Sequence, residues 1–398
     1  MSDVPESPGG PSAFPPSRPG AARPYRSPPL PPSRSSFLGC AFALSFALNL
    51  IGGIVILVLC LGFSLLHKPT TVPLAEKHYS GKSTATDKVA IITLDGIILE
   101  GLLAYPHKQI EQAAEDKHVK AVVVRINSPG GSITASDDLY RKLLELRDGN
   151  SKKEQAPRPL IVSMGGLAAS GGYYVAMPGQ TIFAERTTLT GSIGVYTSFP
   201  NVKELGNKYG VSLVTIKQGE IKDSGSPFAE MSPHERQVWQ DMVDDAYQHF
   251  LHIVETGRPM LAGGKLLEPL TLKPIQAGPT FLKDKADKPQ EQYRRYLADG
   301  GVWTAEKALK YKLVDKIGTL DDAVQAALDA AKLSEEYQAI KYERPSTLAD
   351  LMGFGVESHA LPTGSVLDPA RLQAGFAPRL WYLSPGAELS GFFAAMRE

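Results

Sequence analysis

The sequence predicts a layered α/β domain preceded by one transmembrane helix. From Lys88 onward, short apolar runs rich in β-branched residues alternate with helix-like stretches, as in a sheet that is covered by helices. Ahead of this domain, the thirty residues Phe37–Leu66 include no charged side chain, and about 20 apolar residues already cross a bilayer as a helix. These two patterns predict the fold class and an attachment to the membrane.

The N-terminal region divides into three segments. Residues 1–36 contain eleven prolines and eight serines, too little apolar surface to offset the entropy of ordering, so we expect disorder. Residues 37–66 form the expected transmembrane helix, since the run is longer than the roughly 7–15 residues of a signal-peptide core and no small-x-small cleavage pattern follows it. Residues 67–87 are expected to be a linker. Four arginines precede the span and three lysines follow it closely, which favours a cytoplasmic N-terminus by a small margin.

Composition excludes several kinds of function. Lysine plus arginine equals aspartate plus glutamate, at 42 each, and no basic stripe with interleaved aromatic residues is present, so nucleic-acid binding is not expected. The two cysteines, Cys40 and Cys60, both lie in the predicted span. The chain from His67 onward therefore has neither a disulfide framework nor a thiolate metal site.

The predicted soluble domain covers residues 88–345. Its expected strands are Val89–Leu94, Ala121–Ile126, Leu160–Met164 and Ser212–Ile216. Its expected helices are 106–117, 135–147, 168–177, 202–209, 232–255, 304–311 and 320–332.

Two regions depart from the strand–helix alternation. Residues 259–299 carry five prolines and many lysines, which indicates an insertion, because a loop of that length is uncommon inside a compact domain. Residues 346–398 mix glycine and proline with apolar clusters such as Leu380–Leu383. The sequence leaves open whether this C-terminal tail packs on the domain, touches the membrane or joins an oligomer.

Two glycine-rich turns follow buried strands. Asn127–Ser132 contains Pro-Gly-Gly, which is either an ordinary turn or a place where backbone N–H groups point at a developing oxyanion. Gly165–Tyr174 places Ser170 between small residues on a strand-to-helix turn. A serine there is either a helix N-cap or a nucleophile at a helix N-terminus. The pattern alone does not decide between these roles.

A serine nucleophile needs a base that accepts its proton. No histidine lies between His118 and His234, and neither HExxH nor another metal-binding spacing is present. Lysine is the remaining candidate, provided that burial favours its neutral form. Lys222 follows a predicted strand in a segment punctuated by glycine and proline, although its own surroundings are those of a surface lysine.

Five ordered motifs connect these segments to a known family. The chain contains Ser-Pro-Gly-Gly, Ala-Ser-Gly-Gly-Tyr-Tyr, Thr-Gly-Ser-Ile-Gly-Val and Lys-Asp-x-Gly-Ser-Pro, followed by Asp299–Ala308 with Leu313–Gly318. This set, which spans residues 88–335, resembles the signal peptide peptidase A (protease IV) family of serine peptidases, family S49. The resemblance implies a Clp/crotonase-like spiral of ββα units and no metal or nucleotide cofactor.

The resemblance also implies roles for five residues. Ser170 matches the nucleophile, Lys222 the general base, and Ser192 a serine that helps to orient the lysine. Gly131 and Gly171 match the oxyanion donors, with Gly130 as an alternative to Gly131.

The implied protein is a membrane-anchored endopeptidase that degrades signal peptides or other apolar peptides. It would be a single-pass protein of the plasma (inner) membrane, with a cytoplasmic N-terminus and an extracytoplasmic catalytic domain. Longer members of the family carry the catalytic unit twice in tandem, with the serine in one half and the lysine in the other. Because this chain holds one motif of each kind, the resemblance implies a homo-oligomer with shared active sites. The alternatives are a membrane serine protease of the kind encoded beside stomatin-like proteins, and a catalytically silent scaffold on a crotonase-type fold. A crotonase acting on a coenzyme A thioester is disfavoured, because glycine and serine stand where acidic residues would be expected.

Overall fold

The computed structural model describes residues 44–47, 49–54, 73–270, 295–343 and 381–383. The chain forms two compact units, residues 1–71 and 72–398. In the first unit, residues 44–47 and 49–54 are helical. Within the described residues, no helix has both the length and the apolar character that a membrane span requires. Most of the predicted span 37–66 lies outside the described residues, as does the tail 1–36, so both remain predictions.

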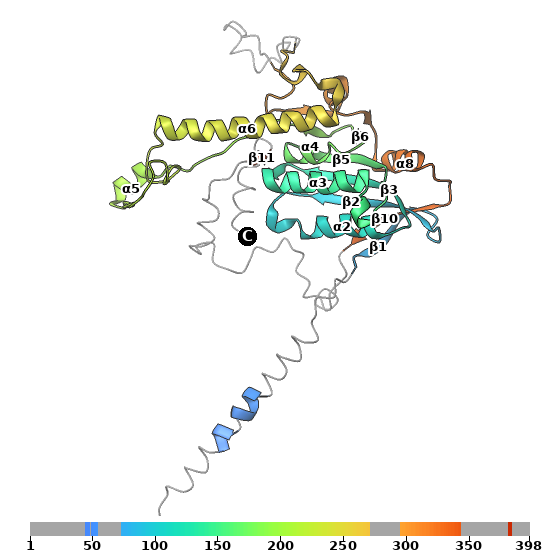
Figure 1. Cartoon of the computed structure of the whole chain (residues 1–398), viewed down its shortest axis with the longest axis horizontal. Helices are drawn as coiled ribbons and strands as arrows, with labels where there is room; N and C mark the ends of the chain where they lie inside the picture. Colours follow the sequence, from blue (N-terminus) through green and yellow to red (C-terminus); the bar gives the residue numbers. More distant parts are fainter. Residues whose placement is uncertain (1–43, 48, 55–72, 271–294, 344–380, 384–398) are drawn as a thin grey trace, which may run out of the picture. The chain divides into compact units, whose positions relative to one another are not determined.

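A large, mostly parallel sheet forms the centre of the second unit (Figure 1). Its strands follow the order β1-β10-β2-β3-β5-β6-β9, with β7 paired to β5 and β8 paired to β7. All of these pairs are parallel except β1–β10 and β7–β8. The strands are β1 (Ala75–Gly81), β2 (Asp87–Asp95), β3 (Val119–Ser128), β5 (Leu160–Ala169), β6 (Thr181–Ala184), β7 (Leu189–Gly191), β8 (Val302–Thr304), β9 (Lys316–Ile317) and β10 (Tyr337–Glu343).

The expected helices are present in the second unit with small changes in their bounds. Ala168 and Ala169 end β5 instead of opening a helix, so that the helix predicted from residue 168 begins after Ser170. The helices are α2 (Ala104–Glu115), α3 (Ile133–Asp148), α4 (Gly171–Val175), α5 (Lys203–Tyr209), α6 (Pro233–Gly257), α7 (Ala305–Lys310) and α8 (Leu320–Ala331). The layered α/β class is thereby confirmed.

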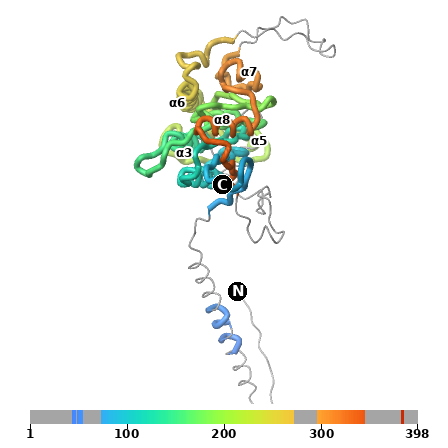
Figure 2. Tube along the Cα trace, turned by 90° about the vertical axis from the view of Figure 1, so that its right-hand side faces the viewer, coloured from blue at the N-terminus to red at the C-terminus, as the bar shows by residue number. Residues whose placement is uncertain are grey.

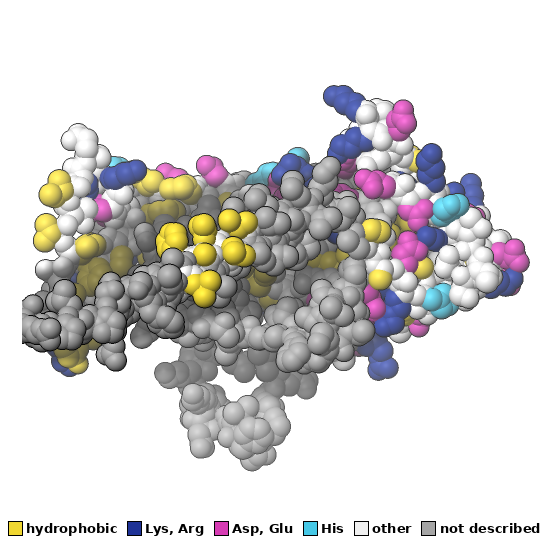
Figure 3. Space-filling view, turned by 90° about the horizontal axis from the view of Figure 1, so that it is seen from below, with side chains coloured by type: hydrophobic (Ala, Val, Ile, Leu, Met, Phe, Trp, Pro, Cys, Tyr) yellow, Lys and Arg dark blue, Asp and Glu magenta, His cyan; other side chains and the backbone are white. Residues whose placement is uncertain are grey.

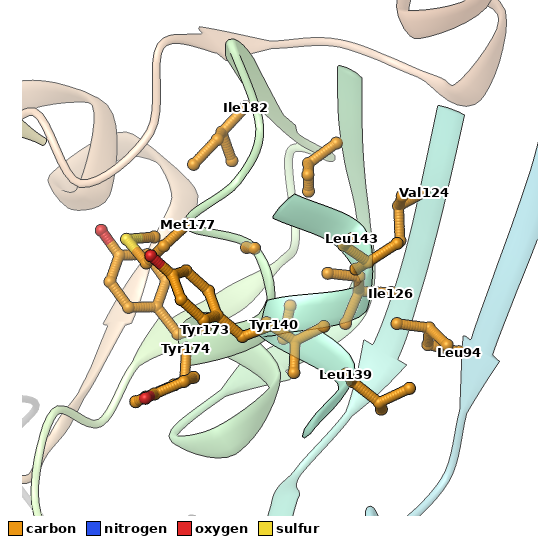
Figure 4. Packing of buried hydrophobic residues seen from close by; sticks show 14 of the residues in the cluster. Leu94, Val124, Ile126, Leu139, Tyr140, Leu143, Tyr173, Tyr174, Met177 and Ile182 are labelled. Carbon is orange, nitrogen blue, oxygen red and sulfur yellow. The ribbon is translucent and has the colours of Figure 1, made fainter. Parts of the chain in front are cut away.

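Helices cover both faces of the sheet, and alternate residues of each strand point to opposite faces. On β2, Ala90 and Ile92 pack in a cluster with residues of α2, α3 and α4, part of which Figure 4 shows. Val89 and Ile91 pack in a second cluster with α8. The helix α8 faces the viewer in Figure 2. Burial on both faces explains why the sequence of this strand is almost continuously apolar.

The long helix α6 begins at a well-defined cap. The Ser232 side chain accepts a hydrogen bond from the Glu235 backbone, and the Glu235 carboxylate accepts one from the Ser232 backbone. Pro233 occupies the first turn, where its missing N–H costs nothing. The C-terminal end of the helix is buried through Phe250 and Val254, whereas its N-terminal half extends past the sheet (Figure 1).

Residues 202–245, which we call the arm, contain α5, the following loop and the exposed half of α6. One prediction is wrong here: Ser212–Ile216 forms no strand and is exposed. A strand needs a partner for its backbone groups, and this segment has none among the described residues of the sheet. The apolar run therefore indicated a surface that none of the described residues covers.

The predicted insertion is described only at its two ends. Its first residues form two short 3₁₀ turns, Pro259–Leu261 and Lys265–Leu267. The backbone N–H of Leu270 donates to the carbonyl of Arg295 at 2.7 Å, which brings the two ends together. Residues 271–294 lie outside the described residues.

Candidate active site

Ser170 lies directly after β5, at the carboxyl end of the parallel strands. Its side chain is fully buried, and its backbone has φ 55° and ψ −118°, a conformation that residues other than glycine rarely adopt. Its backbone N–H donates to the Gly191 carbonyl at 2.7 Å. The Ser170 hydroxyl makes no hydrogen bond with the described residues. A strained serine with an unpaired hydroxyl is typical of a nucleophile on a sharp turn and not of an N-cap.

Three glycines lie beside this serine. A Cβ atom built on Gly130 would lie 2.6 Å from the Gly171 backbone nitrogen, and one on Gly171 would lie 3.1 Å from the Gly131 nitrogen. Gly130 itself has φ 98°, a conformation that glycine adopts without strain. The two glycine-rich turns of the sequence thus meet at Gly171, the residue that follows Ser170.

Ser192 occupies the equivalent position on the neighbouring strand. Ala169 of β5 is paired with Gly191 of β7, so Ser170 and Ser192 each follow the end of one of two adjacent strands. The Ser192 hydroxyl donates to the Gly300 carbonyl at 2.9 Å, and its backbone N–H donates to Gly301 at 3.0 Å. The motif that starts at Asp299 therefore fixes the position of Ser192.

An ion pair stabilises the loop that starts at Asp299. Arg295 forms two hydrogen bonds with the Asp299 carboxylate, at 2.6 and 2.8 Å, and Asp299 also accepts from the Gly301 backbone at 2.9 Å. These interactions hold the pKa of Asp299 below its usual value despite partial burial. The carboxylate stays charged and keeps the loop against Ser192.

Lys222 lies elsewhere, in the arm. Its side chain is exposed, and its neighbours Lys217 and Asp223 form an ion pair. None of the hydrogen bonds or ion pairs of the described residues joins Lys222 to Ser170. The structure therefore brings Ser170, Ser192, Gly131 and Gly171 together within one subunit and leaves Lys222 apart from them.

A short C-terminal strand, β11 (Trp381–Leu383), was not predicted from the sequence. It pairs antiparallel with β4 (Gly130–Ser132), and Tyr382 lies opposite Gly131. On its other side, Trp381 and Tyr196 exchange two backbone hydrogen bonds, at 3.0 and 3.3 Å. The apolar cluster Leu380–Leu383 was the available signal, but it does not indicate which surface this segment covers.

Histidine is nevertheless present near the site. The Tyr174 hydroxyl donates to the Asp137 carboxylate at 2.8 Å and lies 2.9 Å from Nε2 of His249. Burial and the hydrogen bond to Asp137 raise the pKa of Tyr174, so its hydroxyl remains protonated. This cluster joins α3, α4 and α6 and has no hydrogen bond to Ser170 among the described residues. Because α6 starts more than sixty positions after the serine, sequence proximity gave no sign of it.

Hydrophobic side chains are exposed on the arm, at the left end of Figure 3. Val214 is 85% exposed and Ile216 is 97% exposed. A group of exposed apolar side chains of this kind is typical of an interaction surface. The other exposed large hydrophobic residues of the arm are Leu205, Tyr209, Val211, Leu213, Ile221 and Met242.

Comparison with known proteins agrees with this geometry. The family model described as peptidase family S49 matches residues 152–288 and 285–334. A Synechocystis protein described as a protease is 34% identical over 255 residues, which are 64% of this chain and 78% of that protein. An Enterococcus faecium protein that bears the name signal peptide peptidase is 31% identical, over 60% of this chain and 59% of its own length.

Protease 4 of Haemophilus influenzae is 30% identical over 265 residues, which are 65% of this chain. The match covers 36% of that relative, so this chain corresponds to about one third of protease 4. Together with the extensive coverage of the Synechocystis relative, these similarities show that the chain belongs to peptidase family S49.

Proposed function

We propose that this chain is a membrane-anchored serine endopeptidase that uses Ser170 and Lys222 as a catalytic dyad. Membership of the family makes it a serine peptidase with peptide substrates. The observation that carries the assignment of the nucleophile is the buried, strained Ser170 with its unpaired hydroxyl. The spiral arrangement of a Clp/crotonase-like fold, which the motifs imply, belongs to the same proposal.

The base is proposed to come from a neighbouring subunit. Lys222 is exposed on the arm, and the arm also carries the uncovered apolar side chains of Leu213, Val214 and Ile216. Docking of this surface on the next subunit would bury these side chains together with the aliphatic part of the Lys222 side chain. Burial of an amine favours its neutral form. An exposed strand-like segment also pairs readily with another chain. The active form is then a homo-oligomer with shared sites.

The reaction on a peptide would proceed by acyl transfer. The neutral amine of Lys222, oriented by Ser192, removes the Ser170 proton as the oxygen attacks the carbonyl carbon. The oxyanion is stabilised by backbone N–H groups of Gly131 and Gly171. The C–N bond breaks as Lys222 returns the proton to the leaving amine, and water then hydrolyses the ester and regenerates Ser170.

The substrates are proposed to be signal peptides or other apolar peptides at the membrane. A relative named as a signal peptide peptidase supports this class. A membrane serine protease of the type encoded beside stomatin-like proteins is the nearest alternative, and substrate profiling separates the two. Labelling by a fluorophosphonate probe separates either enzyme from a silent scaffold, since only an activated serine reacts.

Peptidase activity is expected to rise towards alkaline pH. The ammonium form of Lys222 cannot accept the Ser170 proton, so activity follows the fraction of neutral amine. The measurement is the pH profile of kcat/KM with a fluorogenic peptide, together with a thermal-stability profile that excludes unfolding. An optimum in acid with a decline through neutrality would indicate a carboxylate mechanism instead.

The domain from residue 67 onward is proposed to lie outside the cytoplasm, with residues 1–36 inside. This topology rests mainly on the resemblance to the family, and the small excess of basic residues before the predicted span favours the same orientation. Alkaline phosphatase fused after residue 398 is expected to be active, and the same fusion at residue 30 inactive. The opposite pattern would overturn both the localisation and the proposed class of substrate.

A further inference from the structure

The loop that carries Lys222 is folded around an ion pair between Lys217 and Asp223. The Lys217 ammonium donates to the Asp223 carboxylate and, at 2.6 Å, to the Glu220 carbonyl oxygen. These contacts close residues 217–223 into a turn in which Lys222 directly precedes Asp223. Among the described residues, the Lys222 amine takes part in no ion pair or side-chain hydrogen bond. The carboxylate next to the proposed base is therefore bound to a different lysine.

Two further contacts fix this loop on the arm. The ring nitrogen of Trp239, on α6, donates to the Ser224 hydroxyl at 2.9 Å, and the ring centroids of Trp239 and Phe199 lie 4.8 Å apart. Gly225 has φ 85°, and a Cβ atom built on it would lie 2.6 Å from the Phe199 ring. Glycine fits this position because it has no side chain to displace the ring. The loop is thereby held in one position against α6.

The pairing of Asp223 matters because a base has to lose its own proton first. An unpaired carboxylate close to a lysine favours the ammonium form, which accepts no proton. The hydrogen bond and the positive charge of Lys217 hold the pKa of the Asp223 carboxyl below its usual value. Asp223 therefore stays ionised and bound to Lys217. The ammonium of Lys217 also offsets the negative charge beside Lys222, and a nearby cation favours a neutral amine.

The loop has other titratable neighbours: Glu220, His234 and Glu235. The Glu235 carboxylate accepts a hydrogen bond from the Ser232 backbone at 2.7 Å, as part of the cap of α6. The Glu220 side chain is 84% exposed, and its carboxylate lies 3.7 Å from Nδ1 of His234. Solvent and salt screen a charge that is exposed to this extent. Asp223 is thus the carboxylate whose charge acts most directly on Lys222.

We infer that Lys217 is a positioning residue of the peptidase, which binds Asp223 so that this carboxylate does not pair with the general base Lys222. The inference rests on the proposed function, in which Lys222 is the base. Docking of the arm on the next subunit makes the role more important. A carboxylate that is buried without a partner is costly and would bind the nearest ammonium, whereas one that is already paired keeps its partner.

The pH profile of kcat/KM, measured on full-length variants with a fluorogenic peptide, tests this role. Lys217→Met removes the charge but keeps an unbranched side chain, so the released Asp223 should displace the profile towards alkaline pH by about 0.5–1 unit. Activity on the rising part of the profile should then fall by about threefold to tenfold. Lys217→Arg keeps the charge and should keep the wild-type profile.

A second set of variants reverses the sign of the effect. Asp223→Asn leaves Lys217 without its counter-charge and should displace the profile towards acid. Lys217→Met combined with Asp223→Asn removes both charges and should return the profile close to that of the wild type. The matched control is Lys203→Met, since the Lys203 ammonium lies 3.2 Å from the Glu230 carboxylate in another ion pair of the arm. Loss of that pair should leave the profile in place.

The outcomes separate this inference from the proposed function. If Lys217 only supported the loop, Lys217→Met would lower activity by the same factor at every pH, and adding Asp223→Asn would not restore it. That result would overturn the role of Lys217 and leave Lys222 as the base. If Lys217→Met failed to fold, an unmoved profile in Asp223→Asn would overturn the same role. A wild-type profile that does not rise towards alkaline pH, or an active Lys222→Ala variant, would overturn the proposed base and this inference with it.

Discussion

Ser170→Ala is expected to reduce peptide hydrolysis to background, and Lys222→Ala to reduce it by about 10²–10⁴-fold. Removal of the nucleophile leaves nothing to form the acyl-enzyme, and loss of a general base typically costs a factor of that size. The two changes together should cost no more than Ser170→Ala alone, because groups that act as a unit are not additive. Initial rates with a fluorogenic peptide, at equal amounts of folded protein, measure all three effects.

Matched controls identify the chemical cause of each loss. Lys222→Arg keeps a positive charge but has no neutral form that can act as a base, so it should be as inactive as Lys222→Ala. Lys208, another exposed lysine of the arm, should tolerate alanine with little loss. Fluorophosphonate labelling should disappear in Ser170→Ala while the circular dichroism spectrum stays unchanged. Retention of more than about a tenth of the activity in Lys222→Ala would contradict the assignment of the base.

The sequence predicted those parts of the fold in which a local pattern has one physical explanation. Val89–Leu94 became β2 because a short β-branched run that is apolar on both faces fits a covered parallel strand. Ser212–Ile216 has a similar composition but no strand partner among the described residues of its own subunit. An apolar run indicates that the side chains of a segment favour burial. It does not indicate whether the residues that bury them belong to the same chain. The wrong strand prediction and the exposed arm have this common cause.

The candidate site shows the same limit. Ser170 and the glycines beside it follow closely after the ends of predicted strands. The glycine-rich turns at these strand ends identified them as candidate site residues from the sequence alone. The position of Lys222 relative to Ser170 depends on tertiary packing and, in the proposed oligomer, on subunit packing, neither of which sequence spacing determines. The pairing of Tyr382 with Gly131 joins positions about 250 residues apart, and no periodicity reports such a contact. Residues placed by long-range pairing were the ones that sequence reasoning missed.

Mixing two inactive variants is expected to restore peptidase activity. If one subunit supplies Ser170 and the next supplies Lys222, an interface between a Lys222→Ala subunit and a Ser170→Ala subunit can hold an intact serine and an intact lysine. In a closed ring assembled at random from equal amounts, about a quarter of the sites would be complete, since each interface has one orientation. Neither variant alone should exceed about 1% of the wild-type activity, which makes the expected gain large.

A second mixture tests the same geometry in the opposite direction. Wild-type subunits mixed equally with the Ser170→Ala/Lys222→Ala double variant should keep about a quarter of the wild-type activity if sites are shared, but about a half if each subunit carries its own dyad. Both mixtures must be dissociated and reassembled, and native mass spectrometry should verify that mixed oligomers are present. Verified mixed oligomers of the two single variants that remain inactive would place the complete dyad within one subunit. The arm would then have to bend so that exposed Lys222 reaches buried Ser170 of its own chain.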